Sequence, residues 1–272
     1  MAVYKINPKK KNFIFNLSLS NQLIILNIIT FFITFVLLNF YGEEFVLNYI
    51  ALTPSMILSG KSVWTLLTSM FMHGGAFHLF ANMFSLFFIG NFLEKLIGRK
   101  RFFWLYLISG IIGGLFFVLS TWIMGNLDTP AVGASGAIFG LLGMLAVLVP
   151  FSRVYLIAGP LILILLEVIV PPFLPAEFVP IWSMLINVGI LIMIFALFSF
   201  SPRFRKFAIP IELPMWLVPI IAIVPLSIIS LFVELPIGNS AHFGGLVVGL
   251  AVAWYLVKKF PKKTKYMCRH VK

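Results

Sequence analysis

The sequence predicts an all-α, polytopic bundle of about eight transmembrane helices, with both termini in the cytoplasm. Three observations lead to this fold class. Of the 272 residues, 61% are hydrophobic and only 10% are charged, the mean hydropathy is +1.08, and basic residues form short clusters between long apolar runs. Such a composition is typical of membrane proteins and excludes an ordinary soluble domain. The net charge of +12 does not indicate nucleic-acid binding, because its distribution follows the pattern of membrane topology.

Each predicted span is an apolar run of about 17–25 residues, the length that crosses a bilayer as a helix. A basic N-terminal segment, residues 1–21, precedes the first run. No small-residue cleavage site follows that run, so we expect an uncleaved span rather than a signal peptide. The runs are residues 22–41, 76–93, 102–124, 132–149, 154–170, 179–200, 213–233 and 239–257. They form one predicted transmembrane domain, residues 22–257, followed by a basic cytoplasmic tail, residues 258–272.

The distribution of lysine and arginine tests this count of spans. With the N-terminus inside, 19 of the 20 basic residues lie on the cytoplasmic side, and only Lys61 lies outside. The acidic residues expected on the outer side are Glu43, Glu44, Asp128, Glu177 and Glu234. A wrong number of spans would scatter these charges, so the positive-inside rule supports eight spans.

With this orientation, three spans begin at the outer face and carry polar side chains at one depth. These side chains are His78 and Asn82, Ser135, and His242. Polar and ionisable groups in a bilayer are costly, so each is a candidate for a functional site. A hydroxyl and an imidazole are the minimum needed for an activated nucleophile, which makes Ser135 and His242 the central pair.

Small residues line the two spans that carry this pair. Gly136, Gly140 and Gly143 follow Ser135 at helical spacing, and Gly245 and Gly249 follow His242. Glycines let helix backbones approach closely in lipid, so two helices meeting on these faces would bring the hydroxyl to the imidazole. Either motif alone is more often only a packing surface. Together, at matched depth, they favour a catalytic dyad.

His78 and Asn82 are four residues apart and share one helix face. Both can donate hydrogen bonds to a developing oxyanion, which is a large effect in acyl-transfer catalysis. The alternative is that they are hydrogen-bonded contacts between membrane helices.

Other catalytic classes lack their residues in this chain. There is no H-E-x-x-H motif, and the single aspartate excludes a site of two aspartates sharing a proton. We expect no metal and no cofactor. Glu167 or Glu234 could orient His242, but nothing in the spacing requires a third member. Phe139, one turn after Ser135, either stacks on the imidazole or is an ordinary core residue.

Three motifs together resemble the rhomboid family of intramembrane serine proteases. They are His73-x-x-x-x-His78-x-x-x-Asn82, Gly133-x-Ser135-Gly136 and Ala241-His242-x-x-Gly245-x-x-x-Gly249, in the order of the family. The resemblance covers roughly residues 60–150 and 236–258, and it implies a rhomboid-like core.

The resemblance implies a role for each matching residue. Ser135 is similar to the nucleophile and His242 to the general base. His78 and Asn82 match the oxyanion donors, acting with the Ser135 backbone N–H and supported by Gly133. His73 matches a more outward histidine with a structural or water-related role, and Trp64 and Glu94 resemble framework residues.

The sequence departs from the family pattern at three places. Thr65 stands where arginine often follows the loop tryptophan, and Phe139 stands where tyrosine is common. Ser135 and His242 are separated by 106 residues, enough for three helices instead of one, so inserted helices are expected within about residues 154–235. Because the number of helices between them stays odd, the helix that carries Ser135 and the helix that carries His242 still run parallel across the membrane. Many prolines there predict kinks that could gate substrate entry.

We therefore expect an intramembrane serine endopeptidase that cleaves transmembrane segments of membrane proteins near the outer leaflet. Its expected partners are transmembrane protein substrates and the lipid bilayer, with no nucleic acid. Its expected location is the cell membrane of a prokaryote, with the site toward the outer face. The alternatives are an inactive rhomboid-like protein that binds client transmembrane helices, and a transporter, although no internal repeat supports the latter.

Overall fold

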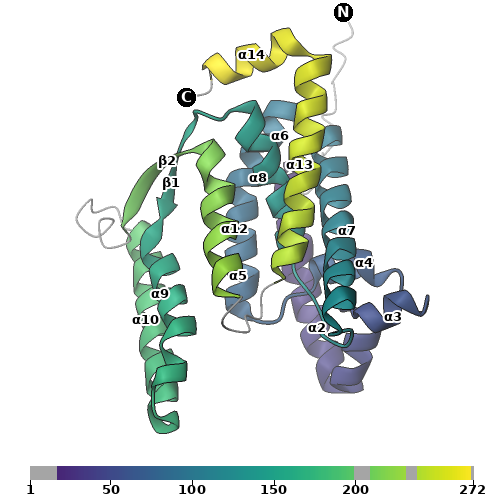
Figure 1. The fold of residues 1–272 in the computed structure, drawn as a ribbon, viewed down its shortest axis with the longest axis vertical. Coiled ribbons are helices and arrows are strands. Elements are labelled where there is room, and N and C mark those ends of the chain that lie inside the picture. Colours follow the sequence, from purple (N-terminus) through teal and green to yellow (C-terminus); the bar gives the residue numbers. More distant parts are fainter. Residues whose placement is uncertain (1–16, 199–208, 231–237, 271–272) are drawn as a thin grey trace, which may run out of the picture. The chain divides into compact units, whose positions relative to one another are not determined.

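The computed structural model describes residues 17–198, 209–230 and 238–270 (Figure 1). It is overwhelmingly helical, which confirms the all-α, polytopic character of the chain. The chain divides into two compact units, residues 1–144 with 238–256 and residues 145–237 with 257–272. Some predictions fall outside the described residues: the basic segment 1–16, the basic cluster Arg203, Arg205 and Lys206, and Glu234.

Helices long and apolar enough to cross a membrane account for much of the described chain. They are Leu19–Tyr49, Ala76–Ile97, Arg99–Met124, Ala176–Met193 and Asn239–Lys259, and shorter apolar helices are Ser135–Leu148 and Met215–Pro225. The five long helices coincide with five of the eight predicted runs, and the two shorter helices lie within two others. The chain is therefore a multi-pass integral membrane protein.

The first unit begins with α2 (Leu19–Tyr49), whose backbone is kinked where Gly42 takes φ +81°. The helical residues beyond this kink end at Tyr49, and the segment that follows contains α3 (Pro54–Leu58), α4 (Thr65–Thr68) and η1 (Ser69–Phe71). The next span consists of α5 (Ala76–Ser85), the π-helical η2 (Leu86–Gly90) and α6 (Asn91–Ile97). It is followed by α7 (Arg99–Met124), α8 (Ser135–Leu148) and α13 (Asn239–Lys259).

The helix α8 supplies much of the core of this unit. Ala134, Ala137, Ile138, Leu141 and Met144 are all almost completely buried. A helix that is apolar and buried on several faces belongs in the interior of a bundle, because lipid-facing helices bury only one stripe. This placement surrounds the start of α8 with other helices of the unit.

The second unit contains the segment between the two site helices. Here β1 (Arg153–Ile157) pairs antiparallel with β2 (Pro210–Pro214), and the Arg153 guanidinium lies 3.4 Å from the Glu212 carboxylate. The helices are α9 (Ala158–Ile169), η3 (Pro171–Phe173), η4 (Ala176–Phe178), α10 (Val179–Phe198), η5 (Met215–Leu217), α12 (Val218–Ile229) and α14 (Pro261–His270).

The predicted helical run at residues 154–170 differs from the structure. Its first residues form β1, and α9 has 12 residues, which is about 18 Å of helix against a bilayer core of about 30 Å. The physical reason is that an apolar run does not by itself distinguish a strand from a helix. In addition, Pro210 and Pro214 disfavour a helix in the partner segment, so the run predicted at 213–233 becomes helical only from Met215.

Candidate active site

Ser135 is the first residue of α8, and the chain before it is hydrogen-bonded to the segment between α2 and α5. Leu52 and Ala131 exchange two backbone hydrogen bonds of 3.0 and 2.9 Å, and the Gly133 N–H donates to the Ser69 carbonyl at 2.9 Å. Gly133 has φ +121°, a conformation that favours glycine because other residues would be strained. These hydrogen bonds therefore position the start of α8, and with it the Ser135 side chain.

His242 lies in the first turn of α13 and directly beside the serine. Its Nε2 atom is 2.7 Å from the Ser135 Oγ, and its ring stacks on Phe139 with centroids 4.4 Å apart and an interplanar angle of 19°. A neutral imidazole with its proton on Nδ1 can accept the serine proton at Nε2. The structure thus brings together Ser135 and His242, and Phe139 takes the stacked arrangement that the sequence left open.

Glycines explain how α8 and α13 come so close. A methyl group at Gly245 would collide with the Gly136 carbonyl, and one at Gly249 would collide with the Gly140 carbonyl. The two helices are therefore in backbone-to-backbone contact along this face, which only glycine permits. This close approach is what allows two short side chains at the ends of their helices to reach hydrogen-bond distance.

The helix α7 holds the start of α13 from another side. The Ser120 and Ser240 hydroxyls are 2.7 Å apart, and a methyl group at Gly113 would lie 2.7 Å from the Ala241 carbonyl. Sequence reasoning missed Ser120 and Ser240, because isolated serines at positions 120 residues apart carry no pairing signal.

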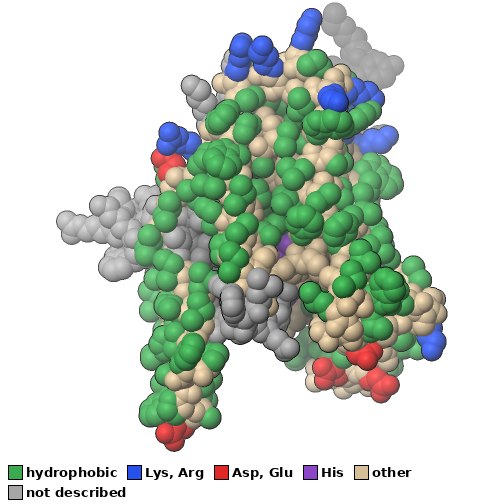
Figure 2. All heavy atoms as spheres, viewed as in Figure 1, with side chains coloured by type: hydrophobic (Ala, Val, Ile, Leu, Met, Phe, Trp, Pro, Cys, Tyr) green, Lys and Arg blue, Asp and Glu red, His purple; other side chains and the backbone are tan. Residues whose placement is uncertain are grey.

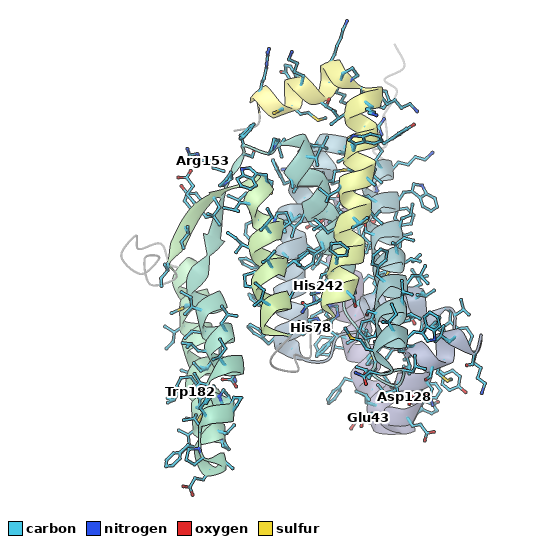
Figure 3. All side chains as sticks on the ribbon, in the orientation of Figure 1. Glu43, His78, Asp128, Arg153, Trp182 and His242 are labelled. Atoms are coloured by element: carbon cyan, nitrogen blue, oxygen red, sulfur yellow. The ribbon has the colours of Figure 1, made fainter. Side chains whose placement is uncertain are left out.

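His78 and Asn82 face the turn that precedes Ser135. A methyl group at Gly133 would lie 2.8 Å from the His78 imidazole and 3.7 Å from Asn82 Nδ2. The Asn82 amide donates one hydrogen bond to the His78 carbonyl at 3.0 Å, which leaves its second N–H for another acceptor. Figure 3 shows His78 on α5 close to His242 on α13. All four predicted residues therefore converge on one place.

His73 lies in the loop just before α5 and is buried. Its ring makes an edge contact with His78, with centroids 5.2 Å apart. The pKa of His73 is lowered to about 4, mainly by burial and to a lesser extent by the neighbouring His78. His73 is therefore neutral at physiological pH, and its ring contact is with His78.

The two predicted framework residues make specific contacts. The Glu94 carboxylate accepts hydrogen bonds of 2.9 Å from the backbone N–H groups of Leu19 and Ser20, and so caps the start of α2. Trp64 Nε1 donates to the Tyr49 carbonyl at 2.9 Å. Thr65 is buried and donates to the Ser62 carbonyl at 2.6 Å, so this loop has internal hydrogen bonds without an arginine.

Carboxylates are not in contact with the dyad in the part of the chain that the structure describes. The Nδ1 atom of His242 is buried and has no hydrogen-bond partner among the described residues. Asp128 instead accepts a 2.7 Å hydrogen bond from Ser55. Within the described ranges there is also no group of three histidine, cysteine or acidic side chains that could hold a metal ion.

The sequence profile of the rhomboid domain matches residues 60–181 and 186–259, well over half of the chain. RHOMBOID-like protein 1 of Arabidopsis thaliana is 48% identical over 93 residues, which cover 34% of this chain and 23% of that protein.

Two further relatives carry contrasting names. The Bacillus subtilis protein named "Putative rhomboid protease YdcA" is 42% identical over 90 residues, 33% of this chain and 43% of that protein. Inactive RHOMBOID-like protein 8 of Arabidopsis thaliana is 39% identical over 87 residues, 32% of this chain and 23% of that protein. The matched segments span less than half the length of each of these relatives.

Proposed function

This chain belongs to the rhomboid family, and on that premise we propose that it is an intramembrane serine endopeptidase with a Ser135–His242 dyad. Its proposed substrates are membrane proteins, cleaved within transmembrane segments near the outer leaflet. The observation that carries the proposal is the 2.7 Å distance between His242 Nε2 and Ser135 Oγ. In a bilayer, a hydroxyl and an imidazole at this distance are costly to keep unless they have a function.

In the proposed reaction, Ser135 Oγ attacks the scissile carbonyl carbon while His242 Nε2 takes the hydroxyl proton. The C–N bond then breaks, and His242 returns the proton to the leaving amine. Water entering from the outer side next attacks the acyl carbon while His242 Nε2 takes a proton from it. The bond between that carbon and Ser135 Oγ then breaks, His242 returns the proton to Oγ, and the new carboxyl group is released. Phe139 supports this role because its stacked ring fixes the plane of the imidazole.

The oxyanion that forms in both steps needs donors on one side of Ser135. The Ser135 N–H is at the start of α8, where backbone N–H groups have no acceptor within the helix. The free N–H of Asn82 and the His78 ring lie around the same turn, at Gly133. We propose these three groups as the oxyanion site, with Gly133 giving the room that the His78 ring occupies.

The substrate segment must unwind locally before it is cut. A carbonyl in a helix is hydrogen-bonded and shielded by the preceding turn, so Ser135 cannot approach it. We therefore expect small or helix-breaking residues near the cleavage site of the substrate.

The proposed topology has eight spans with both termini in the cytoplasm, in the cell membrane of a prokaryote. Within the first unit, α7 runs from the basic cluster Arg99–Arg101 toward Asp128, and Figure 3 shows Asp128 and Glu43 beyond the histidines at the same end. This segregation of charge supports an outward-facing site. The short helix α9 is the crossing with the weakest support.

A second candidate function is an inactive rhomboid-like protein that binds client transmembrane helices. The similarity to Inactive RHOMBOID-like protein 8 keeps this candidate open. The hydrogen-bonded pair Ser135 and His242 favours the enzyme, because a binding protein has no need of an activated serine.

A fluorophosphonate probe separates the two candidates, because it reacts only with an activated serine. Purified protein is labelled beside Ser135→Ala and His242→Ala, with folding checked by circular dichroism. We expect labelling of the wild type alone. The matching assay is cleavage of a transmembrane substrate after reconstitution in lipid vesicles. Cleavage that persists in Ser135→Ala would sink the assignment, and a folded wild type without labelling or cleavage would favour the binding protein.

A further inference from the structure

We propose that α14 is a binding surface for anionic lipid headgroups at the membrane face where α13 ends. This short helix follows α13 after a break at Phe260 and begins with Pro261. Its charge, the arrangement of its side chains and its distance from the bilayer each support the proposal. None of them depends on the proposed proteolytic activity.

Exposed cations dominate the surface of α14. Lys262, Lys263, Lys265 and Arg269 are exposed, and Figure 2 shows basic side chains projecting at the upper edge of the view, where Figure 1 places this helix. Residues 238–270 contain no aspartate or glutamate. No ion pair engages these four side chains among the residues that the structure describes. These four cations are therefore available to an anionic surface outside the described chain.

The cations are not spread evenly around the helix. Lys262, Lys265 and Arg269 share one face with Tyr266, at positions i, i+3, i+4 and i+7. On the other side Thr264 is buried, and Met267 and Cys268 are half-buried. The helix therefore presents a face of three cations and one exposed tyrosine, and tyrosine is a residue that prefers the headgroup layer.

The positive charge at the start of α14 destabilises the helix. Lys262 and Lys263 lie in its first turn, where the helix dipole disfavours cations. An anionic surface alongside would offset this repulsion. The helix should thus be more ordered on an anionic membrane than on a neutral one.

The chemistry and location together select a lipid surface over a soluble polyanion. The last residues of α13, Lys258 and Lys259, end a helix long enough to cross the bilayer, so α14 starts at the headgroup layer. A basic segment next to a span sits within the range where the surface potential of anionic lipids acts, about one Debye length. Because α14 is covalently attached to α13, it always lies near the lipid headgroups, whereas a soluble polyanion would have to bind from solution.

The single cysteine of the chain makes a direct test possible. Cys268 is half-buried in α14, so a nitroxide attached there reports on this helix without other substitutions. Full-length protein is reconstituted in nanodiscs of phosphatidylcholine, with or without one third phosphatidylglycerol. We expect the spin label to lose mobility when phosphatidylglycerol is present. Salt near 1 M, where the Debye length is about 3 Å, should reverse the effect.

Substitutions then test the named face. The triple variant Lys262→Gln, Lys265→Gln, Arg269→Gln should lower the affinity of α14 for the anionic surface by about 100-fold and abolish the lipid-dependent change. Lys61→Gln, an exposed lysine in the outer loop, is the matched control and should behave as wild type. A phosphatidylglycerol titration of thermal stability on unlabelled protein repeats the comparison without the nitroxide.

Three results would overturn the proposal. The first is equal mobility in the two lipid compositions. The second is a phosphatidylglycerol effect that survives in the triple variant. The third is a spin label that inorganic polyphosphate immobilises in phosphatidylcholine nanodiscs but that phosphatidylglycerol in the nanodisc does not immobilise. That result would assign the surface to a soluble polyanion.

Discussion

The ring of Phe139 lies almost parallel to the imidazole of His242, with centroids 4.4 Å apart. Phe139 lies one helical turn after Ser135, so the proposed nucleophile and the ring that stacks on its proposed base come from the same helix. Because His242 Nδ1 has no hydrogen-bond partner among the described residues, the contacts that orient the ring are this stacking and the hydrogen bond between Nε2 and Ser135.

Replacing Phe139 therefore tests what holds the proposed base. Phe139→Leu should slow fluorophosphonate labelling about tenfold, because an aromatic stacking contact contributes about 0.5–1.5 kcal/mol. Phe139→Tyr keeps the ring and should label at nearly the rate of the wild type. Phe87→Leu, an exposed phenylalanine on η2, is the control. Equal rates for all four proteins would mean that stacking does not orient His242.

Asn82→Ala tests the proposed oxyanion site. Cleavage should fall by about 10²–10³ in kcat with little change in KM, because an oxyanion donor acts mainly in the transition state. Asn39→Ala is the matched control, since Asn39 makes the same hydrogen bond to the carbonyl four residues earlier, at 2.7 Å, in α2. If both variants keep the kcat of the wild type, the Asn82 side chain only makes its hydrogen bond within α5 and does not stabilise the oxyanion.

Gly245→Ala tests the contact between α8 and α13. The new methyl group would collide with the Gly136 carbonyl, so the helices must separate, at a cost of about 1–3 kcal/mol. Thermal unfolding in detergent should shift downward, and labelling of Ser135 should drop. Gly238→Ala, where the methyl group would make an ordinary 3.6 Å contact with Ala241, should change neither measurement. Unchanged unfolding and labelling in Gly245→Ala would show that this contact can relax.

Glu94→Gln tests the cap on α2. The neutral amide can accept only one of the two backbone hydrogen bonds from Leu19 and Ser20, so the free energy of unfolding should fall by about 1–3 kcal/mol. Glu44→Gln, at an exposed position in α2, should leave the unfolding temperature unchanged. Cleavage per folded molecule should stay the same in both variants. A loss of kcat in Glu94→Gln without loss of stability would contradict a framework role.

The sequence was sufficient to predict that Ser135, His242, His78 and Asn82 lie close together, because the helices that carry them have strong, independent signals. Hydropathy located α7, α8 and α13, and the motif spacing placed His78 and Asn82 on one face. The Ser120–Ser240 contact was not predictable, since it depends on how two helices are rotated against each other. The strands β1 and β2 were missed because their apolar residues look the same to a hydropathy scale as those of a buried helix.

The pairing of β1 with β2 has a consequence for changes in the length of the chain between them. Ile157 and Pro210 are partners in the register, so the excursion of residues 158–209 leaves and returns at the same point. A segment with adjoining ends can be gained, lengthened or lost in one genetic event without displacing the residues before and after it. A change in the length of this excursion can therefore leave the pairing of β1 with β2 intact.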